Sequence, residues 1–540
     1  MLTLLISKSP LLRFPGFLRK LPASHHSICG GRGVPRILLF ILCAMRYAPC
    51  AMSAAVAPFI VIFICTTLMF TSSLAATPEA ARNQFMLDIK KFAAFEDRST
   101  GTPGCNSAAA YIKDQFKKLG IDTVGSHLFN LPVRQHKGSH LIEPQKNLIV
   151  PIQPFFLNAI SPPTALSQGL EGPLVYVGPG ELHHFNGKQI QGSIVLMDID
   201  SSKNWIHAAS LGAKALVYLD GDATLKMHFE DKMELSPVQF PRFRMKRSEA
   251  RKVFGPFETA PAGLVFQNIR LYSDTTWQQV QGENIYGLIS GTDPDLRDEL
   301  VIVEAFYDST VYVPGLSPGA DEAVSIATLL NLARVFIRQP PGRSVLIVAT
   351  AGHAQTLVGM REMIWSIRFR SKDLRKLEKD LKATEKHARK VLSMLEDVGK
   401  RGASSFRASA ISEEDATADL LIDAVSDRLK TQDDSISRRL MRLRLDTTGE
   451  KNQETIDNLV KERTVLRRLG WKTTLTDITD EELKAIERFI PLSIDDYKRI
   501  LADAGKQLKT LKSARRFRTL AKSMEIAAVV SLHLSSHGGG

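Results

Sequence analysis

Cysteine is scarce in this chain, and four of its five cysteines lie within the first 76 residues. Only Cys105 lies beyond that point. Disulfide bonds therefore do not hold the fold together, and a cysteine-based metal cluster is excluded from the body of the protein. A chain of 540 residues has room for two or three domains. Because disulfides cannot stabilise them, these domains depend on hydrophobic cores of their own.

Acidic residues are absent before Glu79, which changes the meaning of the net charge of +13. The basic residues in that stretch account for seven of the net positive charges; they are Lys8, Arg13, Arg19, Lys20, Arg32, Arg36 and Arg46. The remaining excess is spread over a long body without interleaved aromatic and basic residues. This distribution argues against nucleic-acid binding.

Charge of either sign is also absent between Tyr47 and Pro78, where an apolar run leads into the small residues of "SSLAA". A basic flank, an apolar run and small residues predict a secretory signal peptide within residues 1–76. The run is also long enough to remain as a membrane anchor. In either case the body is expected outside the cytoplasm, secreted, periplasmic or anchored to a membrane. A buried core helix is the alternative.

The rest of the chain divides into segments by its hydrophobic patterns. Residues 77–143 open with two helical patterns, and residues 144–275 alternate short apolar strands with Gly/Pro turns and a short helix. Residues 276–365 alternate strands and helices on a larger scale, and residues 525–540 return to a strand pattern that we expect to be a truncated end. This order predicts an α/β fold whose sheet is covered by helices on both faces.

Residues 366–524 interrupt that pattern with a long helical insertion. Leu374, Leu381, Ala388 and Leu395 fall seven residues apart, and a second apolar run follows from Ile422 to Leu443. Such heptads predict antiparallel helices of a coiled-coil-like arm inserted into the sheet domain. Two interpretations of this insertion remain open. It is either a solvated helical hairpin with no functional role, or an arm that binds a protein partner or another copy of the chain.

Six short motifs occur in an order that resembles metallopeptidase family twenty-eight, the zinc aminopeptidases, with an inserted protease-associated domain. The resemblance covers roughly residues 80–365 and 525–540. It implies a mixed sheet covered by helices on both faces and a small α/β protease-associated domain at residues 144–275. The motifs are "RSTGTPG", "AAAYIKDQFKKLGI", "GSIVLMDIDSSKNWIHAASLGAKALVYLDGD", "ENIYGLISGTDPDLRDELVIVEAFYDS", "PGADEAVSIATLLNLARVF" and "RSVLIVATAGHAQTLVGMRE".

The resemblance also implies two zinc ions held by imidazole and carboxylate ligands. It puts Phe306 and Ala354 at two ligand positions, and neither side chain has a lone pair to offer a metal. Glu322 falls at the bridging carboxylate, His353 at the general base and His533 at an aspartate ligand. Most positions that should hold the metals are therefore substituted.

Two carboxylates that would support the ligands, Asp308 and Asp321, are retained. Glu322, His353 and His533 would meet at one sheet edge, and two histidines with a carboxylate are a known single-zinc ligand set. The alternative is that both histidines are tolerated in a cleft without metal.

These substitutions favour an extracytoplasmic peptidase-like protein that is catalytically degenerate and acts as a binding scaffold. In this hypothesis no cofactor is needed, a peptide or protein ligand occupies the cleft, and nucleic acid is no partner. The alternative is an active metallo-exopeptidase, an aminopeptidase with a rewired zinc site. A purely structural coiled-coil protein would explain only residues 366–524.

Overall fold

The computed structural model describes residues 78–534, apart from residues 146, 159–162, 166–167, 222–223, 235–236, 405–414, 446–452 and 473–477. The signal peptide or anchor predicted within residues 1–76 lies outside the described residues, as do residues 535–540. Among the described helices, none combines the length and the apolar character needed to cross a membrane.

The body of the molecule is built on a mixed sheet in the order β11-β9-β10-β8. Strands β9 (Glu299–Phe306), β10 (Ser344–Thr350) and β11 (Glu525–Leu532) run parallel, and β10 pairs antiparallel with the end of β8 (Leu264–Ile289). Every residue of β10 is buried, as expected for a strand covered on both sides. The predicted mixed α/β sheet is confirmed.

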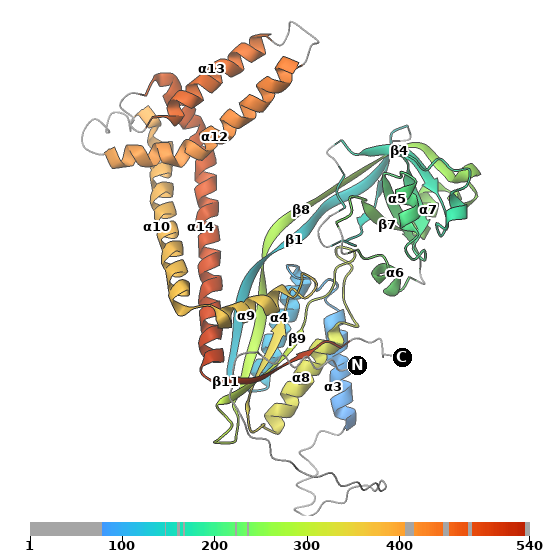
Figure 1. The fold of residues 1–540 in the computed structure, drawn as a ribbon, viewed down its shortest axis with the longest axis vertical. Helices are drawn as coiled ribbons and strands as arrows, with labels where there is room; N and C mark the ends of the chain where they lie inside the picture. The colour runs from blue at the N-terminus through green and yellow to red at the C-terminus, as the bar shows by residue number, and fades with distance from the viewer. Residues whose placement is uncertain are drawn as a thin grey trace, which may run out of the picture.

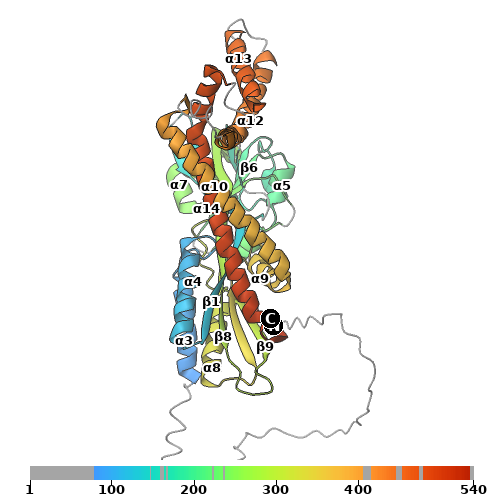
Figure 2. The same ribbon diagram turned by 90° about the vertical axis from the view of Figure 1, so that its left-hand side faces the viewer.

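Helices cover both faces of this sheet (Figures 1 and 2). On one face α3 (Pro78–Ala93), α4 (Pro103–Lys118) and α8 (Ala323–Arg338) share a core with β9 and β10. On the other face α9 (Val358–Arg368) and the base of α14 (Asp480–Lys522) pack on the same strands. The parallel strands are therefore fixed between two apolar layers, and their carboxyl ends meet at one edge.

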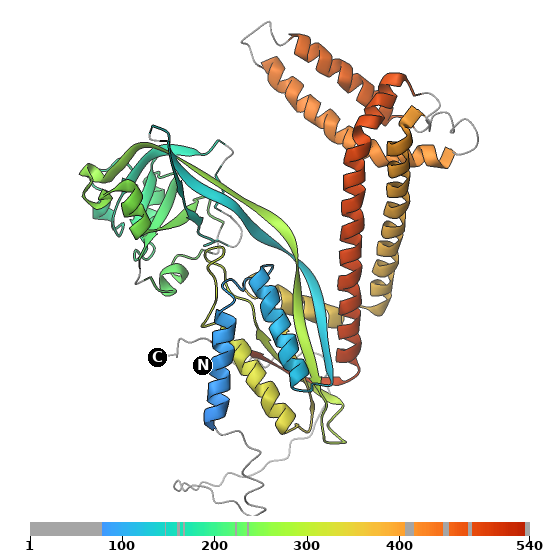
Figure 3. The ribbon, with the colours of Figure 1, turned by 180° about the vertical axis from the view of Figure 1, so that it is seen from behind.

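A long two-stranded ribbon leaves the sheet and is seen from behind in Figure 3. It consists of β1 (Thr123–Glu143) paired antiparallel with β8 from Ile142 opposite Arg270 to Thr123 opposite Leu288. Strand β1 lies within residues 77–143, which the sequence analysis described only as helical. The boundary predicted between residues 275 and 276 falls inside β8. The ribbon was not recognised in the sequence because the polar residues on its exposed side interrupt the apolar runs.

The ribbon leads to a second α/β unit in which β4 (Leu170–Tyr176), β5 (Ile194–Asp198), β6 (Ala215–Asp220) and β7 (Arg242–Lys246) are parallel neighbours. Apolar clusters lie on both faces of these strands. The predicted strand–helix–strand order is present, with α5 between β5 and β6. The smaller elements are β2 (Leu148–Pro151), β3 (Gln153–Pro154), α5 (Trp205–Ser210), α6 (Met227–Glu230), α7 (Arg247–Phe254) and the 3₁₀ turns Leu182–Phe185, Phe257–Thr259 and Pro261–Gly263.

A helical arm rises from the body (Figure 1). Helix α10 (Ser371–Arg401) packs along α14, while α12 (Asp415–Leu445) and α13 (Gln453–Gly470) form a hairpin at the far end. The sequence predicted antiparallel helices without fixing which of them pair, and in the structure the main partner of α10 is α14. A heptad pattern defines the apolar seam of a helix and not the helix that covers it.

Candidate functional site at the ends of β9, β10 and β11

Three aromatic rings meet where the parallel strands end. Phe306 is the last residue of β9, His353 follows the end of β10, and His533 follows β11 directly. The rings of Phe306 and His353 are stacked, with centroids 3.9 Å apart and planes 15° apart. His533 lies edge-on to both, 5.4 Å from Phe306 and 4.9 Å from His353. The phenyl ring of Phe306 thus packs against two imidazoles, which also contact each other, at the position where the resemblance implies a metal ligand.

The environment keeps His353 neutral. Burial, together with the neighbouring His533, lowers the pKa of His353 to about 4. At neutral pH its imidazole therefore carries no charge and can stack on Phe306 without burying an ion. His533 is exposed.

Asp308 anchors the loop that carries His353. Its buried carboxylate accepts hydrogen bonds from Thr100 Oγ1 at 2.7 Å and from the backbone amides of Gly352 at 3.0 Å and His353 at 3.1 Å. Burial raises the pKa of Asp308 to about 7, although the bond from Thr100 opposes that shift. Asp308 therefore holds the backbone of the loop at Gly352 and His353 in place, and this role requires no metal.

The two acidic residues before α8 are also engaged by protein groups. Glu322 accepts hydrogen bonds from the Thr310 amide at 3.0 Å and from Thr310 Oγ1 at 2.7 Å. Asp321 pairs with Lys226 Nζ at 2.5 Å. Lys226 directly precedes α6, so this ion pair links the sheet body to the second unit. Both carboxylates therefore already have partners within the protein.

The donor atoms do not fit a pair of zinc ions. In the part of the chain that the structure describes, Glu322, His353 and His533 do not form a compact group of three metal donors. Such a group does occur at Glu181 and His183, which are exposed, and His184, which is half-buried. There, the Glu181 amide donates to His184 Nδ1 at 3.1 Å, so the other ring nitrogen of neutral His184 carries the hydrogen.

Two buried polar residues at this site were missed by the sequence analysis. Arg98 is fully buried and donates to the carbonyl oxygens of Pro318 at 2.9 Å, Gly319 at 2.6 Å and Tyr307. Glu304, within β9, accepts from the hydroxyls of Thr350 and Ser531, and burial raises its pKa. An acid interrupting the apolar strand "LVIVEAF" was a usable signal, whereas a single arginine in a loop offered none.

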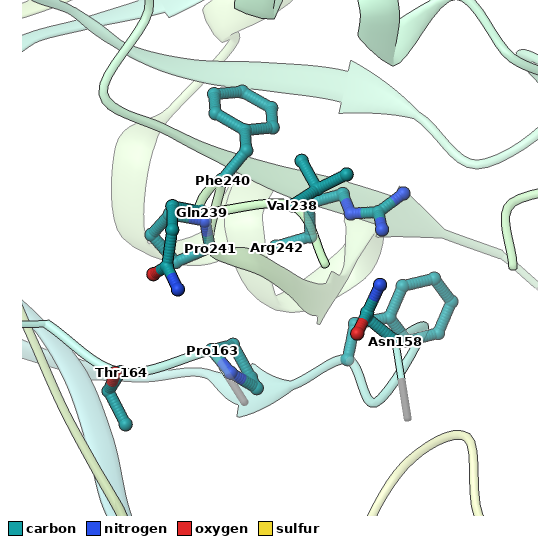
Figure 4. A pocket seen from close by; sticks show the side chains of 9 residues that line it. Asn158, Pro163, Thr164, Val238, Gln239, Phe240, Pro241 and Arg242 are labelled. Carbon is teal, nitrogen blue, oxygen red and sulfur yellow. The ribbon is translucent and has the colours of Figure 1, made fainter. Parts of the chain in front are cut away.

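A cleft of about 780 Å³ adjoins the site. Ala354 and Thr310 line it together with the loop at residues 95–104 and the β1–β8 ribbon. A much smaller pocket of about 20 Å³ lies in the second unit, between Pro163 and the segment Val238–Arg242 (Figure 4). That volume holds about one water molecule. Of these two pockets, the cleft is the one large enough for a peptide ligand.

Comparison with known proteins relates the sheet segment to a family. The model for peptidase family M28 matches residues 284–372, which run from the end of β8 to the start of α10. The segment is therefore similar to that family. The matched residues include Phe306, Asp308, Glu322, His353 and Ala354. No curated protein matches the chain.

Solved structures similar to the chain include zinc aminopeptidases. One from Bacillus subtilis has a TM-score of 0.38 and 22% identity, covering 56% of this chain and 68% of that one. An aminopeptidase from Aneurinibacillus sp. strain AM-1 has a TM-score of 0.32 and 19% identity, covering 55% and 68%. A peptidase M28 precursor from Shewanella amazonensis SB2B has a TM-score of 0.36 and 16% identity, covering 53% and 70%.

Proposed function

We propose that this protein is an extracytoplasmic, non-catalytic member of peptidase family M28 that binds a peptide or protein segment in the cleft beside Ala354. The observation that carries the proposal is the stack of Phe306 on His353, with ring centroids 3.9 Å apart. A metal centre at this edge would have to displace a well-packed aromatic pair and would gain no ligand from Phe306 or Ala354.

Counting donors supports the same conclusion. Structural and catalytic zinc sites need at least three protein ligands at about 2.0–2.3 Å. The ligand positions implied by the resemblance offer two imidazoles and the carboxylate of Glu322, which is held by Thr310. The binding free energy of a metal falls steeply when ligands are missing or misplaced. A cleft without the metals can still bind a peptide through its walls.

Metal analysis of the purified full-length protein, combined with a panel of aminoacyl substrates, tests the proposal. We expect neither stoichiometric zinc nor hydrolysis. The double variant Phe306→His with Ala354→Glu should gain zinc, because it restores two donors at the same strand ends. The His183→Ala variant is the control, since it removes an exposed histidine that could hold adventitious metal. Zinc that survives His183→Ala but is lost in His353→Ala or His533→Ala would overturn the proposal.

The second candidate is an active aminopeptidase with a rewired single-zinc site. The observation in its favour is the proximity of the His353 and His533 rings, with centroids 4.9 Å apart. A third ligand would require Glu322 to leave Thr310. The same zinc measurement distinguishes the two candidates, because this one needs bound metal and turnover that both disappear in His533→Ala.

The helical arm supplies a second surface in the proposal, for a protein partner or another copy of the chain. Four exposed arginines near the end of α12 form no ion pair within the described residues; they are Arg438, Arg439, Arg442 and Arg444. Met441 and Leu445 are exposed beside them. Sedimentation velocity should show association that weakens in Met441→Asp.

The leader supplies the route out of the cytoplasm in this proposal. A secretion assay of the full-length chain tests it.

A further inference from the structure

The cleft has the dimensions of a ligand site and two unlike sides. Its volume of about 780 Å³ lies within the range of small-molecule and peptide pockets. One side is formed by the loop at residues 95–104 and by residues 310–315, next to the Phe306 cluster. The other is formed by the β1–β8 ribbon, including residues 131–136 and 277–280. The ribbon side carries the groups that decide which ligand fits.

Two large apolar side chains are exposed in the cleft, one on the ribbon and one in the segment that follows α6. Trp277 is 49% exposed and Met233 is 38% exposed, and both line the cleft together with Phe156. An exposed tryptophan inside a concave site is typical of ligand-binding surfaces, because the ring offers a large apolar area with little loss of conformational entropy. The cleft therefore favours a ligand with at least one apolar side chain.

Arg134, on β1, adds a positive charge to this apolar surface. Its guanidinium lies 4.3 Å from the centroid of the Phe156 ring and donates from Nη1 to the Asn158 carbonyl. Within the described residues Arg134 makes no ion pair, and neither Nε nor Nη2 has a hydrogen-bond partner. Burial lowers the pKa of Arg134 to about 10, so the side chain remains charged at neutral pH. A half-buried cation without a counter-ion is costly unless a ligand supplies one.

The carboxylates of the cleft do not neutralise this charge. Asp97 is already satisfied by the Ser99 amide at 2.9 Å, Ser99 Oγ at 2.6 Å and the Gly315 amide at 2.8 Å. Glu96 is exposed to solvent and forms no ion pair among the described residues. The free Nε and Nη2 edge of Arg134 is the part of a guanidinium that binds a carboxylate through two parallel hydrogen bonds.

We infer that the cleft binds a peptide carboxylate on the free edge of Arg134, with an apolar side chain of the same peptide packed on Trp277. This inference rests on the proposed function and adds the chemical class of the ligand. The carboxylate can come from the C-terminus of a peptide or from an aspartate or glutamate side chain. Both sources present the same planar pair of oxygens to the guanidinium.

Three fluorescently labelled hexapeptide libraries, each rich in apolar residues, separate the sources in an anisotropy titration of the full-length protein. The first has a free C-terminus and no acidic side chain, the second an amidated C-terminus with one glutamate, and the third an amidated C-terminus with no acid. We expect the third library to bind roughly ten- to a hundredfold more weakly than the better of the first two.

Variants then assign the effect to Arg134. Arg134→Gln should remove the preference for acidic peptides, whereas Arg134→Lys should keep part of it as a point charge. Arg361→Gln is the matched control, because Arg361 is an exposed arginine of the same cleft that bonds to Thr356. Its effect should be the smaller one. Thermal melting of each variant checks that it is folded, and the library comparison on the unmodified chain needs no variant.

The outcomes are distinguishable. Equal binding of all three libraries would overturn the carboxylate inference while leaving peptide binding in place. An unchanged preference in folded Arg134→Gln would overturn it as well. If none of the libraries binds, the proposed peptide-binding function fails and the inference fails with it.

Discussion

The sheet body and the helical arm are stabilised by different kinds of buried contact. The body buries polar groups, among them Arg98, Asp308 and Glu304, and gives each of them hydrogen-bond partners. The arm has a mostly apolar interior, with residues such as Leu395 and Val425 fully buried. Many of its ion pairs, such as Arg463 with Asp433, are partly exposed, although Glu482, the partner of Lys472, is buried.

The difference bears on which substitutions each region tolerates. A buried polar group that loses its partner costs far more than a surface ion pair contributes, because the remaining partner stays desolvated. The polar contacts of the body therefore fix loop positions around the ends of the parallel strands. Apolar burial fixes the arm, which has few buried polar groups among the residues that the structure describes.

The largest effect is expected in the body. Arg98→Met leaves the carbonyl oxygens of Tyr307, Pro318 and Gly319 buried without their donor, so the free energy of unfolding should fall by roughly 3–5 kcal/mol. Urea denaturation measures the loss. Arg343→Met, at an exposed ion pair with Glu299, is the control and should cost far less. Similar losses in the two variants would contradict the comparison.

A cavity in the arm comes next. Leu395→Ala removes a fully buried side chain between α10 and the surrounding helices and should cost roughly 2–4 kcal/mol. Hydrogen exchange should accelerate in α10, α12 and α14 above the body, while β9 and β10 keep their protection. Faster exchange throughout the sheet would mean that arm and body unfold as one unit.

The next effect depends on pH and belongs to the body. The pKa of His353 is about 4 in the folded protein and about 6.5 in the unfolded chain. The unfolded state therefore binds the proton first, and stability should fall as the pH decreases from about 6.5 toward 4. His353→Gln should flatten this part of a stability profile measured by urea denaturation. His183→Gln, at an exposed histidine, is the matched control; an unaltered slope in His353→Gln would refute the assignment.

The smallest effect is expected at the surface of the arm. Arg463→Ala breaks a partly exposed ion pair with Asp433, with 2.8 Å between the charged atoms, and should cost at most about 1 kcal/mol. The loss should shrink further in high salt. Thermal melting at two salt concentrations tests this. A loss as large as that of Leu395→Ala would show that ion pairs, and not apolar packing, hold the arm.

The sequence predicted the sheet body better than its surroundings. Continuous apolar runs identified β9 and β10, because both faces of these strands are covered. Helix α8 was identified by its own apolar pattern. The ribbon formed by β1 and the first part of β8 was not predicted. Polar residues separate the apolar ones along these strands, so they contain no continuous apolar run. The partner of α10 could not be predicted, because an apolar seam carries no record of which helix covers it.

The candidate site also has a part that could be predicted from the sequence and a part that could not. The family resemblance placed Phe306, His353 and His533 at positions of one metal site, and in the structure their rings are in contact. The engagement of Glu322 by Thr310 and the buried Arg98 depend on loop conformation. Hydrophobic periodicity says nothing about such loops, so those contacts had to come from the structure.

The paired strands β1 and β8 make the body and the second α/β unit indivisible. An excised fragment that stopped at residue 275 would end in the middle of β8 and leave half of β1 without a hydrogen-bonding neighbour. Such an exposed edge invites aggregation. Functional dissection of this molecule should therefore proceed by point substitution, because neither half can be isolated without breaking a strand that both of them share.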